Sequence, residues 1–557
     1  MKEDRTIDSL FRYCVERYPG RGFLSSVRRD GGAIHIERTT FAAAGARVAA
    51  TVLRLESLGL GTGDHVLVYT DDIAESIFFL LACFHLGIVP VPIAPLFSVE
   101  YAARVADRVS ARAYFALPEG AALLCQRGLY TLCFADTPSD APPGVERLPA
   151  RADLPTTRAI DVLRAAGTSH GELDPLIITP TSGSTGEPKL PIWSHRSMER
   201  AAYHLGVAFG WAEDPAERAL VVNAPTHGLG LALMSSALLV AAESCVPSRA
   251  DVHTPLDEVR ATDFTCSFMT PRVMKSLHQQ FLDEAGGRAT GRFLGPSARV
   301  VAFSGAPLPV ELCPFLVEQG IEPVDVWGAS ETGIIACSER GRWQEGWLRP
   351  CPGIEVRLTA DREVSLRAPH FFLGYHGDPA LTHAVHDADG YYLSGDAGEI
   401  DADGRVRLTG RTRDVFNTFE GSNIYPARIE SMIEALGWVS QAVMIGDRLP
   451  YCCALIVPWQ VGDGAVTDAD IIDPDGNAAL YERARADLAA VNAKLEQIER
   501  VRRFWLLVRP FANELYERVG LLRKTRRNRA AIGHAFAARI QQLYEPSFPE
   551  IACVPPS

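Results

Sequence analysis

The sequence predicts a layered α/β fold in more than one domain, and three observations support this class. The chain has 557 residues, too many for one compact hydrophobic core. In its first part, helical patterns alternate with short apolar strands such as 66–69 and 88–93, as expected for parallel pairing. From about residue 354 the pattern changes to short alternating strands separated by turns, such as 354–358 and 405–408.

We expect two domains. Residues 1–413 form the large one, made of layered α/β subdomains and a small β-structured part. Residues 414–557 form the small α+β domain, with strands near 441–446 and 452–457 and a helix over 478–496. Strand-like runs at 219–222, 300–303 and 323–326 each end near a predicted site residue, as is usual in open α/β sheets.

Composition excludes several classes of protein. Apolar residues make up 47% of the chain and charged residues 22%, which is ordinary for a soluble globular protein. A net charge of −13 argues against binding to nucleic acid. The 12 cysteines show no metal-binding spacing, and we expect Cys452 and Cys453 to be buried as small hydrophobic residues.

The apolar stretches of the chain predict core helices and not membrane spans. Residues 76–97 are interrupted by His85, Gly87 and prolines, which indicates a buried helix to about Leu86 and then a short strand. Residues 228–242 are too few to span a bilayer comfortably. The N-terminal residues lead into no apolar signal core, so we expect a cytoplasmic protein without a membrane partner.

The most informative stretch is the loop Thr181-Ser-Gly-Ser-Thr-Gly-Glu-Pro-Lys189, which follows the apolar segment 176–178. Glycines let the backbone approach an anion with its N–H groups turned inward, and hydroxyl groups with one ammonium complete the cage. A Walker-type loop would need Gly-Lys-Ser/Thr at the start of a helix, and that sequence is missing here. The loop therefore predicts a phosphate site of another type. Its candidate residues are Thr181, Ser182, Gly183, Ser184, Thr185, Gly186 and Lys189.

Two later segments have the composition of a nucleotide site. Ser304-Gly-Ala-Pro307 places a glycine where a flat ring can lie against the backbone, although an ordinary strand-to-helix turn has the same pattern. Asp325-Val-Trp-Gly-Ala-Ser-Glu331 supplies an indole that can cover a nucleoside and a carboxylate that can hold Mg²⁺. The alternatives are a core tryptophan and a solvated glutamate.

These segments resemble the adenylate-forming superfamily, which includes acyl-CoA synthetases, carrier-loading adenylation domains and luciferases. Residues 181–189 are similar to its phosphate loop, and 327–331 to its Tyr-Gly-x-Thr-Glu motif with Trp and Ser as replacements. Residues 391–396, Tyr-Tyr-Leu-Ser-Gly-Asp, are similar to its Thr-Gly-Asp motif. Residues 410–414, Gly-Arg-Thr-Arg-Asp, are similar to its hinge motif. The matches occur in the family's order.

The resemblance implies roles for these residues in ATP binding. The 181–189 loop would hold the β,γ-phosphates, with Mg²⁺ on Thr185 and Glu331. Asp396 and Arg411 would bind the ribose, because a carboxylate is an acceptor suited to a diol. Asp414 would be the hinge of a mobile small domain. The other implied nucleotide-binding residues are Gly305, Ala306, Pro307, Asp325, Val326, Trp327, Gly328 and Ser330.

The side that binds the acid is less clearly marked in the sequence. His227 and Gly228, in Pro225-Thr-His-Gly-Leu-Gly230, fall where the family places residues beside the acyl substrate. The alternative for His227 is a histidine satisfied inside the core. His195, directly after Trp193-Ser194, is expected to be structural.

Two departures from the family lie in the predicted small domain. The family's C-terminal lysine, which bridges the acid and the α-phosphate, is replaced by Arg527 or Arg529 in the basic run 521–529. A solvated basic face is the alternative, and arginine is not equivalent to lysine. The loop 414–423 is one residue longer than the family's, and its bulky Phe419 lies where relatives line a pantetheine tunnel. Both departures weaken the expectation of CoA transfer.

Three functions remain open from the sequence. The leading one is an ATP-dependent ligase that activates an acid, most simply a carboxylic acid, as its AMP anhydride, releases pyrophosphate and passes the acyl group to CoA. A second keeps adenylation but uses a carrier-protein thiol or an amine as acceptor, including diazotase-like activation of nitrite and coupling to an aryl amine. A third is a non-catalytic nucleotide-binding protein. The expected cofactors are ATP and Mg²⁺, with CoA as the leading acceptor.

Overall fold

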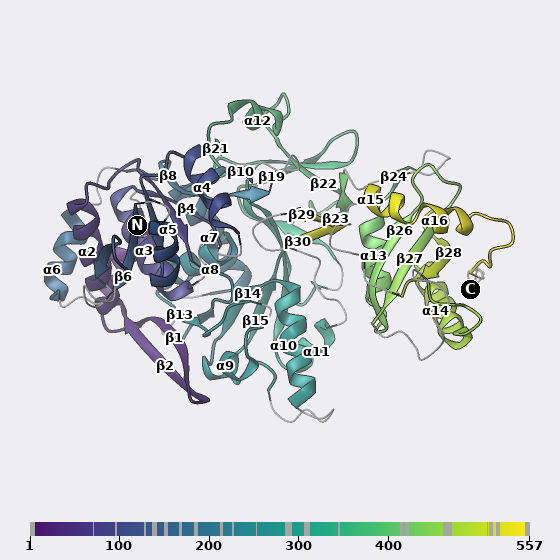
Figure 1. Ribbon diagram of the computed structural model, residues 1–557, viewed down its shortest axis with the longest axis horizontal. Coiled ribbons are helices and arrows are strands. Elements are labelled where there is room, and N and C mark those ends of the chain that lie inside the picture. Colours follow the sequence, from purple (N-terminus) through teal and green to yellow (C-terminus); the bar gives the residue numbers. More distant parts are fainter. Residues whose placement is uncertain are drawn as a thin grey trace. The chain divides into compact units, whose positions relative to one another are not determined.

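The described chain forms two compact units (Figure 1). Unit 1 comprises Met1–Glu355 and Arg367–Tyr392, and unit 2 comprises Val356–Leu366 and Leu393–Ser557. The predicted boundary between residues 413 and 414 falls outside the described residues and stays a prediction. The computed structural model describes all residues except 1–5, 71, 95–96, 127, 129, 136–141, 150–153, 166–169, 183–187, 212–215, 225–227, 252, 285–291, 306–311, 344–345, 413–415, 418–422, 460–470, 509–510, 512–515, 520–523, 528 and 552–557.

The first sheet of unit 1 is entirely parallel, with the strand order β4-β3-β5-β6-β7. The predicted strands 66–69 and 88–93 are β3 and β4, which are in register at Val66 and Pro90. Helix α3 runs between them and ends at Leu86, because Gly87 follows in the left-handed conformation with a φ of 65°. The strands are β3 (His65–Tyr69), β4 (Val89–Pro92), β5 (Ala113–Ala116), β6 (Thr131–Ala135) and β7 (Glu146–Pro149).

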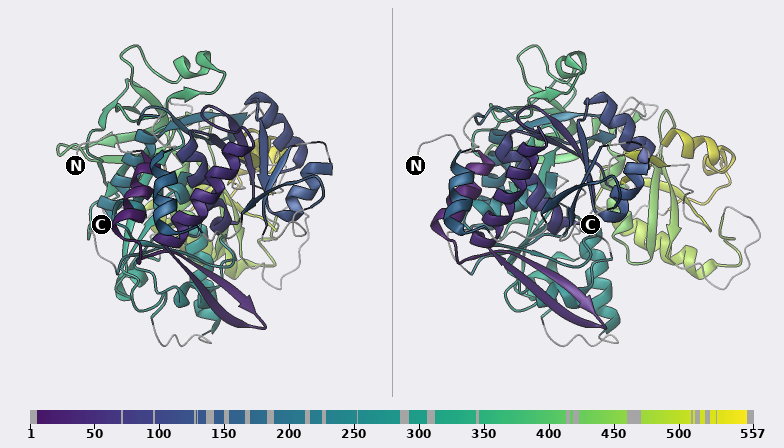
Figure 2. Two further views of the ribbon diagram at one scale, coloured as in Figure 1. Left: turned by 90° about the vertical axis from the view of Figure 1, so that its left-hand side faces the viewer. Right: turned by 60° about the vertical axis from the view of Figure 1, so that its left-hand side comes forward.

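Helices surround this sheet, and several of them contribute to the main core of unit 1. Helices α2 and α3 are labelled in Figure 1, and their purple to dark-blue colours locate them in both views of Figure 2. In α3 the ring of Phe79 stacks on Phe115 of β5 with centroids 4.0 Å apart. No helix in the described part of the chain is long and apolar enough to cross a membrane. The helices here are α1 (Ile7–Arg17), α2 (Phe41–Ser57), α3 (Ile73–Leu86), α4 (Val99–Arg108), α5 (Pro118–Gln126) and α6 (Thr156–Ala165).

The second sheet of unit 1 has the order β18-β17-β16-β15-β14-β12-β13-β1-β2. It is parallel from β16 to β1, so the carboxyl ends of those strands share one edge. The ribbon of β1 and β2 extends past its neighbours (Figures 1 and 2). The strands are β1 (Gly22–Asp30), β2 (Ala33–Thr40), β12 (Arg218–Leu220), β13 (Glu243–Val246), β14 (Cys266–Met269), β15 (Val300–Phe303), β16 (Glu322–Ala329), β17 (Gly333–Ser338) and β18 (Leu348–Pro350).

Among the described residues, five helices belong with the second sheet, and all but the first of them follow one of its strands in the chain. Helix α8 begins at Gly228, soon after β12, and it packs against α7. Gly230 in α8 lies so close to the backbone that a Cβ would be 2.1 Å from the Asn223 carbonyl oxygen, so only glycine fits. The helices are α7 (His195–Phe209), α8 (Gly228–Leu239), α9 (Leu256–Ala261), α10 (Pro271–Glu284) and α11 (Cys313–Glu318).

A small antiparallel sheet completes unit 1 and joins distant parts of its sequence. Its order is β21-β11-β8, and Pro191 lies opposite Tyr375. A separate hairpin, β9 with β10, lies between β8 and β11 in the chain. The elements are β8 (Pro175–Ile178), β9 (Thr181–Ser182), β10 (Pro188–Lys189), β11 (Pro191–Ser194), β21 (Gly374–Tyr375) and α12 (Pro379–Ala384).

Unit 2 contains the strands β19, β20, β22 and β23, which are neighbours in that order, and a smaller sheet in the order β26-β27-β28. The predicted strand 452–457 is the fully buried β27. In it Cys452 and Cys453 are buried as expected, and burial raises the pKa of each thiol to about 12. The elements are β19 (Glu355–Leu358), β20 (Glu363–Arg367), β22 (Tyr392–Ile400), β23 (Val406–Arg411), β24 (Phe416–Asn417), β25 (Asn423–Ile424), α13 (Pro426–Glu434), β26 (Val439–Ile445), β27 (Cys452–Pro458), α14 (Ala478–Asn492), β28 (Val501–Leu506), β29 (Tyr516–Val519), β30 (Lys524–Arg527), α15 (Arg529–Ala535) and α16 (Ala537–Leu543).

Candidate active site

The stem of the predicted phosphate loop is the β9–β10 hairpin, in which Thr181 lies opposite Lys189. Arg108, the last residue of α4, donates a hydrogen bond from Nη1 to the Pro188 carbonyl oxygen at 2.7 Å. The pairing and this bond fix the backbone from which the Lys189 side chain projects. The predicted loop residues Gly183, Ser184, Thr185 and Gly186 lie outside the described residues, and Ser182 is described by its backbone alone.

Tyr375 contacts the two charged residues that the motifs predict. The Lys189 Nζ lies 5.4 Å from the centroid of the Tyr375 ring, within cation–π range. The Tyr375 hydroxyl donates a hydrogen bond to Glu331 Oε1 at 2.6 Å. Burial, and then the Glu331 carboxylate, raise the pKa of Tyr375 well above its ordinary value, so its hydroxyl stays protonated. The structure therefore gathers Lys189 and Glu331 around one phenol.

The segment that carries Tyr375 also holds Glu331 through its backbone. The Tyr375 N–H donates to Thr382 Oγ1 at 2.9 Å. The ring of Phe372 meets the Tyr375 ring edge-on at 5.0 Å, and the Phe372 N–H donates to the Glu331 carbonyl oxygen at 2.8 Å. Gly374 has a φ of 130°, and a Cβ there would lie 3.0 Å from Thr382 Cγ2. These contacts leave the phenol little freedom to move.

The turn between β16 and β17, which presents Glu331, is held in place by the indole of Trp193. Trp193 donates from Nε1 to the Ser330 carbonyl oxygen at 2.6 Å. Gly333 has a φ of 70°, and a Cβ there would lie 3.2 Å from the Trp193 ring. A Cβ at Gly328 would lie 2.4 Å from the Gly333 carbonyl oxygen, so that position also requires glycine. The predicted residues Ser330 and Glu331 therefore sit on a rigid turn, and Gly328 lies in β16 just before it.

Trp327 and Asp325 lie in β16, on a strand that is longer than the sequence indicated. Trp327 is 7% exposed, which agrees with the alternative that it is a core tryptophan. Burial raises the pKa of Asp325 to about 7, while a hydrogen bond from the Val326 N–H acts in the opposite direction. Near neutral pH the Asp325 carboxyl can therefore donate as well as accept a hydrogen bond.

Two other predicted residues of unit 1, Gly305 and Gly228, come after parallel strands of the second sheet in the chain. Gly305 follows β15 with a φ of 85°, which favours glycine over other residues. Gly228 is the first residue of α8, with nothing within 4 Å of an added Cβ. Ala306, Pro307 and His227 lie outside the described residues.

In unit 2, the predicted ribose residues Asp396 and Arg411 are direct neighbours on β22 and β23. Arg411 Nε lies 3.0 Å from Asp396 Oδ1, and Arg411 Nη1 donates to the Ser394 carbonyl oxygen at 3.2 Å. Within β22, the Gly395 N–H donates to Glu363 Oε1 at 2.7 Å and Gly395 has a φ of 70°, so the backbone that precedes the aspartate is fixed. The hinge candidate Asp414 lies outside the described residues.

The two arginines proposed for the missing lysine differ in their surroundings. Arg529 donates to both carboxylate oxygens of Glu430, at 2.6 and 2.8 Å, and to the Met444 carbonyl oxygen at 3.3 Å. Glu430 is 2% exposed and also accepts the Met444 N–H, so this pair supports the core of unit 2. Arg527 ends β30, where its backbone pairs with Tyr516, and its side chain lies outside the described part.

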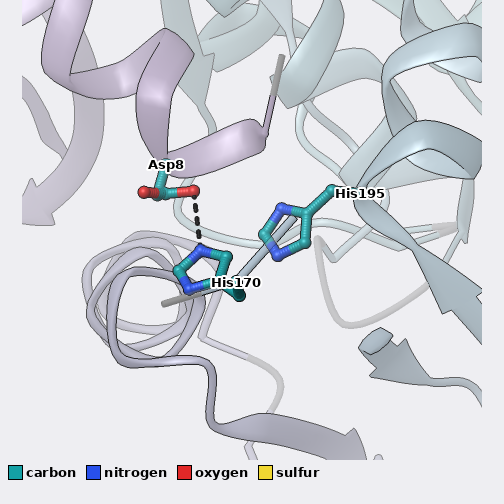
Figure 3. Close-up of side chains that lie close together, drawn as sticks. All are labelled: Asp8, His170 and His195. Carbon is teal, nitrogen blue, oxygen red and sulfur yellow. Dashed lines mark hydrogen bonds and ion pairs between the residues drawn. The ribbon is translucent and has the colours of Figure 1, made fainter. Parts of the chain in front are cut away.

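A separate buried cluster joins α1 to α7 (Figure 3). The donor atoms of Asp8, His170 and His195 lie within 4.8 Å of one another, close enough for a metal ion. His170 Nε2 lies 3.1 Å from Asp8 Oδ1, and His195 Nδ1 accepts the Ile7 N–H at 3.1 Å. Since Nδ1 is the acceptor, the neutral ring carries its proton on Nε2, which leaves His195 no lone pair for a metal. His195 is structural, as the sequence indicated.

Three positioning residues were missed by sequence reasoning: Tyr375, Trp193 and Arg108. Each acts across a long stretch of chain, on a motif that it does not adjoin in sequence. The one local signal was the Gly374-Tyr375 dipeptide, where a glycine of positive φ precedes an aromatic in a two-residue strand. Sheet pairing between β21 and β11, which brings that dipeptide beside the phosphate loop, has no signature in either strand.

The family of the chain follows from sequence comparison, and it agrees with this geometry. The AMP-binding enzyme family matches residues 11–375, and the AMP-binding enzyme C-terminal domain matches residues 413–547. The chain belongs to the AMP-binding enzyme family, and it is an AMP-forming ligase of the adenylate-forming superfamily.

Individual relatives match over nearly the full length of the chain. The long-chain-fatty-acid–CoA ligase FadD15 of Mycobacterium bovis is 26% identical over 91% of this chain and 92% of its own. The solved structure of the anthranilate CoA ligase AuaEII with anthranoyl-AMP has a TM-score of 0.74 and 18% identity, with 97% and 99% of the two chains covered. O-succinylbenzoate CoA synthetase (MenE) of Bacillus subtilis, solved with ATP and magnesium ion, has a TM-score of 0.69 and 18% identity over 94% and 99%. The two structures show a shared fold.

Proposed function

We propose that the chain uses ATP to convert a carboxylic acid into its acyl-AMP anhydride and then transfers the acyl group to the thiol of CoA. The observation that carries this proposal is that Lys189, at the end of the phosphate-loop hairpin, and Glu331 both contact Tyr375. Together they supply a cation and a carboxylate at one place, as MgATP requires. Similarity to a long-chain-fatty-acid–CoA ligase over 91% of this chain supports the acid and the acceptor.

In the first half-reaction a carboxylate oxygen bonds to the α-phosphorus of ATP while the bond to the bridging oxygen breaks, and pyrophosphate leaves. Negative charge spreads over phosphoryl oxygens, so positioning and electrostatic stabilisation account for most of the acceleration. Lys189 supplies a positive charge to these oxygens. Glu331, whose Oε1 accepts a hydrogen bond from Tyr375, would hold Mg²⁺ together with Thr185. Bound Mg²⁺ would neutralise phosphate charge.

The nucleoside is assigned to the predicted residues by their chemistry. Trp327 and the 305–307 segment suit the flat base, and Asp325 can both accept and donate towards its edge. In unit 2, Asp396 and Arg411 suit the ribose hydroxyls and a phosphate oxygen. His227 and Gly228 are assigned to the acid.

In the second half-reaction the thiol sulfur of CoA bonds to the acyl carbon, the acyl–oxygen bond breaks and AMP leaves. Because Arg529 is bound to Glu430 through both oxygens, we assign the charge that bridges acid and α-phosphate to Arg527. Asp414 is assigned as the hinge about which the small domain turns between the two half-reactions.

The proposal is tested by pyrophosphate release with ATP, Mg²⁺ and a panel of fatty acids, aromatic acids and nitrite. Lys189→Ala should lower the rate of pyrophosphate release about 100-fold or more. Lys494→Ala, which removes an exposed lysine, should release pyrophosphate at the wild-type rate. Release by Lys189→Ala at the wild-type rate would remove Lys189 from the phosphate site. Silence of the wild type across the panel would favour a nucleotide-binding protein without catalysis.

The acceptor is identified in a second step with the acid that gives release. Addition of CoA should yield the acyl-CoA thioester, detected by mass spectrometry. A product formed with an aryl amine or a carrier-protein thiol, and none with CoA, would replace CoA by that acceptor.

A further inference from the structure

We propose that Tyr375 is a positioning residue that keeps the Lys189 ammonium and the Glu331 carboxylate apart, so that both charges remain available to MgATP. This inference rests on the proposed function. It adds a role for Tyr375, a side chain to which the proposed reaction assigns none. Three features of the site support it: the geometry of the two contacts, the orientation of the Glu331 carboxylate and the rigidity of the phenol.

The two charged groups use different surfaces of Tyr375. A cation is attracted to the negative face of an aromatic ring, and Lys189 Nζ lies 5.4 Å from the ring centroid. A carboxylate accepts from the hydroxyl, and Glu331 Oε1 lies 2.6 Å from it. An ammonium and a carboxylate on flexible stems would otherwise reach each other and form an ion pair. Because the neutral phenol engages each group separately, on its ring face and at its hydroxyl, it opposes this self-neutralisation.

The hydroxyl also orients the carboxylate. A glutamate has two equivalent oxygens, and the bond from Tyr375 engages Oε1, which leaves Oε2 for a cation. Hydrogen bonds to a ligating carboxylate fix its direction and raise the affinity of a metal site. A tyrosine hydroxyl is ordinarily protonated at neutral pH, so it can donate to the carboxylate in this way.

The phenol itself is held firmly enough to act in this way. Tyr375 is 5% exposed, and its backbone N–H and carbonyl oxygen bond to Thr382 and Asp378. Its neighbour Phe372 contacts the ring and holds the Glu331 carbonyl oxygen at the same time. A cation above a ring is held less strongly than one in a charge-assisted bond to phosphate, so an arriving triphosphate can take Lys189 from the ring.

The experiment compares Tyr375→Phe, which keeps the ring and loses the hydroxyl, with Tyr375→Leu, which loses both. Tyr69→Phe is the matched control, because it removes a buried tyrosine hydroxyl whose bond to the Phe97 carbonyl oxygen is 2.7 Å long. Pyrophosphate release is measured against Mg²⁺ at fixed ATP, and against ATP at saturating Mg²⁺. Thermal unfolding of each variant is recorded beside the rates.

For Tyr375→Phe we expect the Mg²⁺ concentration at half-maximal rate to rise about 10- to 100-fold, with the KM for ATP at saturating Mg²⁺ changed less than about twofold. For Tyr375→Leu we expect the same shift and, in addition, a KM for ATP raised about fivefold or more. Tyr69→Phe should keep the wild-type values of both.

An unchanged Mg²⁺ dependence in Tyr375→Phe would overturn the inference, and so would an equal fall in rate at every Mg²⁺ concentration. The result stays distinct from a failure of the proposed function. If the wild type binds MgATP in calorimetry but releases no pyrophosphate, the proposed reaction fails, while the Mg²⁺ dependence of ATP binding still compares wild type and Tyr375→Phe. If the wild type binds no MgATP, both proposals are refuted.

Discussion

Unit 1 and unit 2 each set a cation against a carboxylate, and they do so in opposite ways. In unit 2, Arg411 and Asp396 touch directly at 3.0 Å on the adjacent strands of one hairpin. In unit 1, Lys189 and Glu331 come from distant motifs. Lys189 contacts the ring of Tyr375, and Glu331 accepts a hydrogen bond from its hydroxyl. The direct pair partly neutralises itself, whereas the separated pair retains both charges. We therefore expect changes in the separated pair to affect catalysis more strongly.

A third pair, Arg529 with Glu430, sharpens the comparison because it is buried in unit 2. Arg529→Ala would leave the Glu430 carboxylate without its partner, and it should lower the free energy of unfolding by about 3–5 kcal/mol. Chemical denaturation measures this loss. Arg485→Ala, which breaks an exposed pair with Glu482 on α14, should cost less than about 1 kcal/mol. Equal losses in both variants would mean that Arg529 does not support the core.

Glu331→Gln tests the separated pair through its carboxylate. The amide keeps the shape and can still accept from Tyr375, but it loses the charge that a cation needs. Pyrophosphate release should fall about 100- to 1000-fold, as for other groups that stabilise a transition state directly, and steady-state kinetics at saturating Mg²⁺ measures it. Glu318→Gln, at an exposed position on α11, serves as the control. A release rate equal to the control's would leave Glu331 without a metal role.

The cluster of Asp8 and the histidines predicts how unit 1 responds to acid. Burial lowers the pKa of His195 from 6.5 to about 4, against the opposing effect of the Asp8 carboxylate. Because the folded pKa lies below the unfolded one, protonation favours the unfolded chain. Stability is therefore full above pH 6.5 and falls as the pH drops from 6.5 towards about 4. At about pH 5, protonation of His195 should lower the free energy of unfolding by about 2 kcal/mol.

His195→Asn tests this response, since the asparagine oxygen can accept the Ile7 N–H but does not titrate. Urea denaturation near neutral pH and near pH 5 should show a smaller fall for the variant than for the wild type. His370, whose pKa burial also lowers to about 4, remains in both proteins and contributes equally. A variant that loses as much stability as the wild type would show that His195 does not titrate in this range.

Asp396→Asn should have the smallest effect of the four changes. Arg411 is half exposed, so the ion pair itself contributes little to stability. The variant would weaken one charge-assisted contact to the ribose, and the KM for ATP should rise about tenfold. Asp403→Asn, in the exposed turn between β22 and β23, is the control. A loss as large as that of Glu331→Gln would break the distinction between the two pairs.

Local patterns in the sequence predicted much of this fold. The strand 300–303 was predicted residue for residue, and the end of α3 at Gly87 followed from its glycine. The parallel pairing of β3 and β4 was expected from the alternation of helices and strands. These features depend on residues close together in the chain, so the sequence carries them directly.

The candidate site was less predictable where its contacts are not local. The motifs indicated Lys189 and Glu331, yet their meeting at Tyr375 depends on sheet pairing across a long stretch of chain. The basic run 521–529 showed no difference between its arginines, because the buried carboxylate of Glu430 that holds Arg529 lies elsewhere in the chain. Charge and spacing predict which residues are available, and tertiary contacts decide which of them are engaged.

The central claim is that an oxygen of the acid attacks the α-phosphorus of ATP, and isotope transfer tests it most directly. The acid is labelled with oxygen-18 in its carboxylate and turned over with ATP, Mg²⁺ and CoA. Mass spectrometry of the AMP should then show a single labelled oxygen in each molecule formed. Unlabelled AMP, or label found in phosphate or pyrophosphate, would contradict the mechanism.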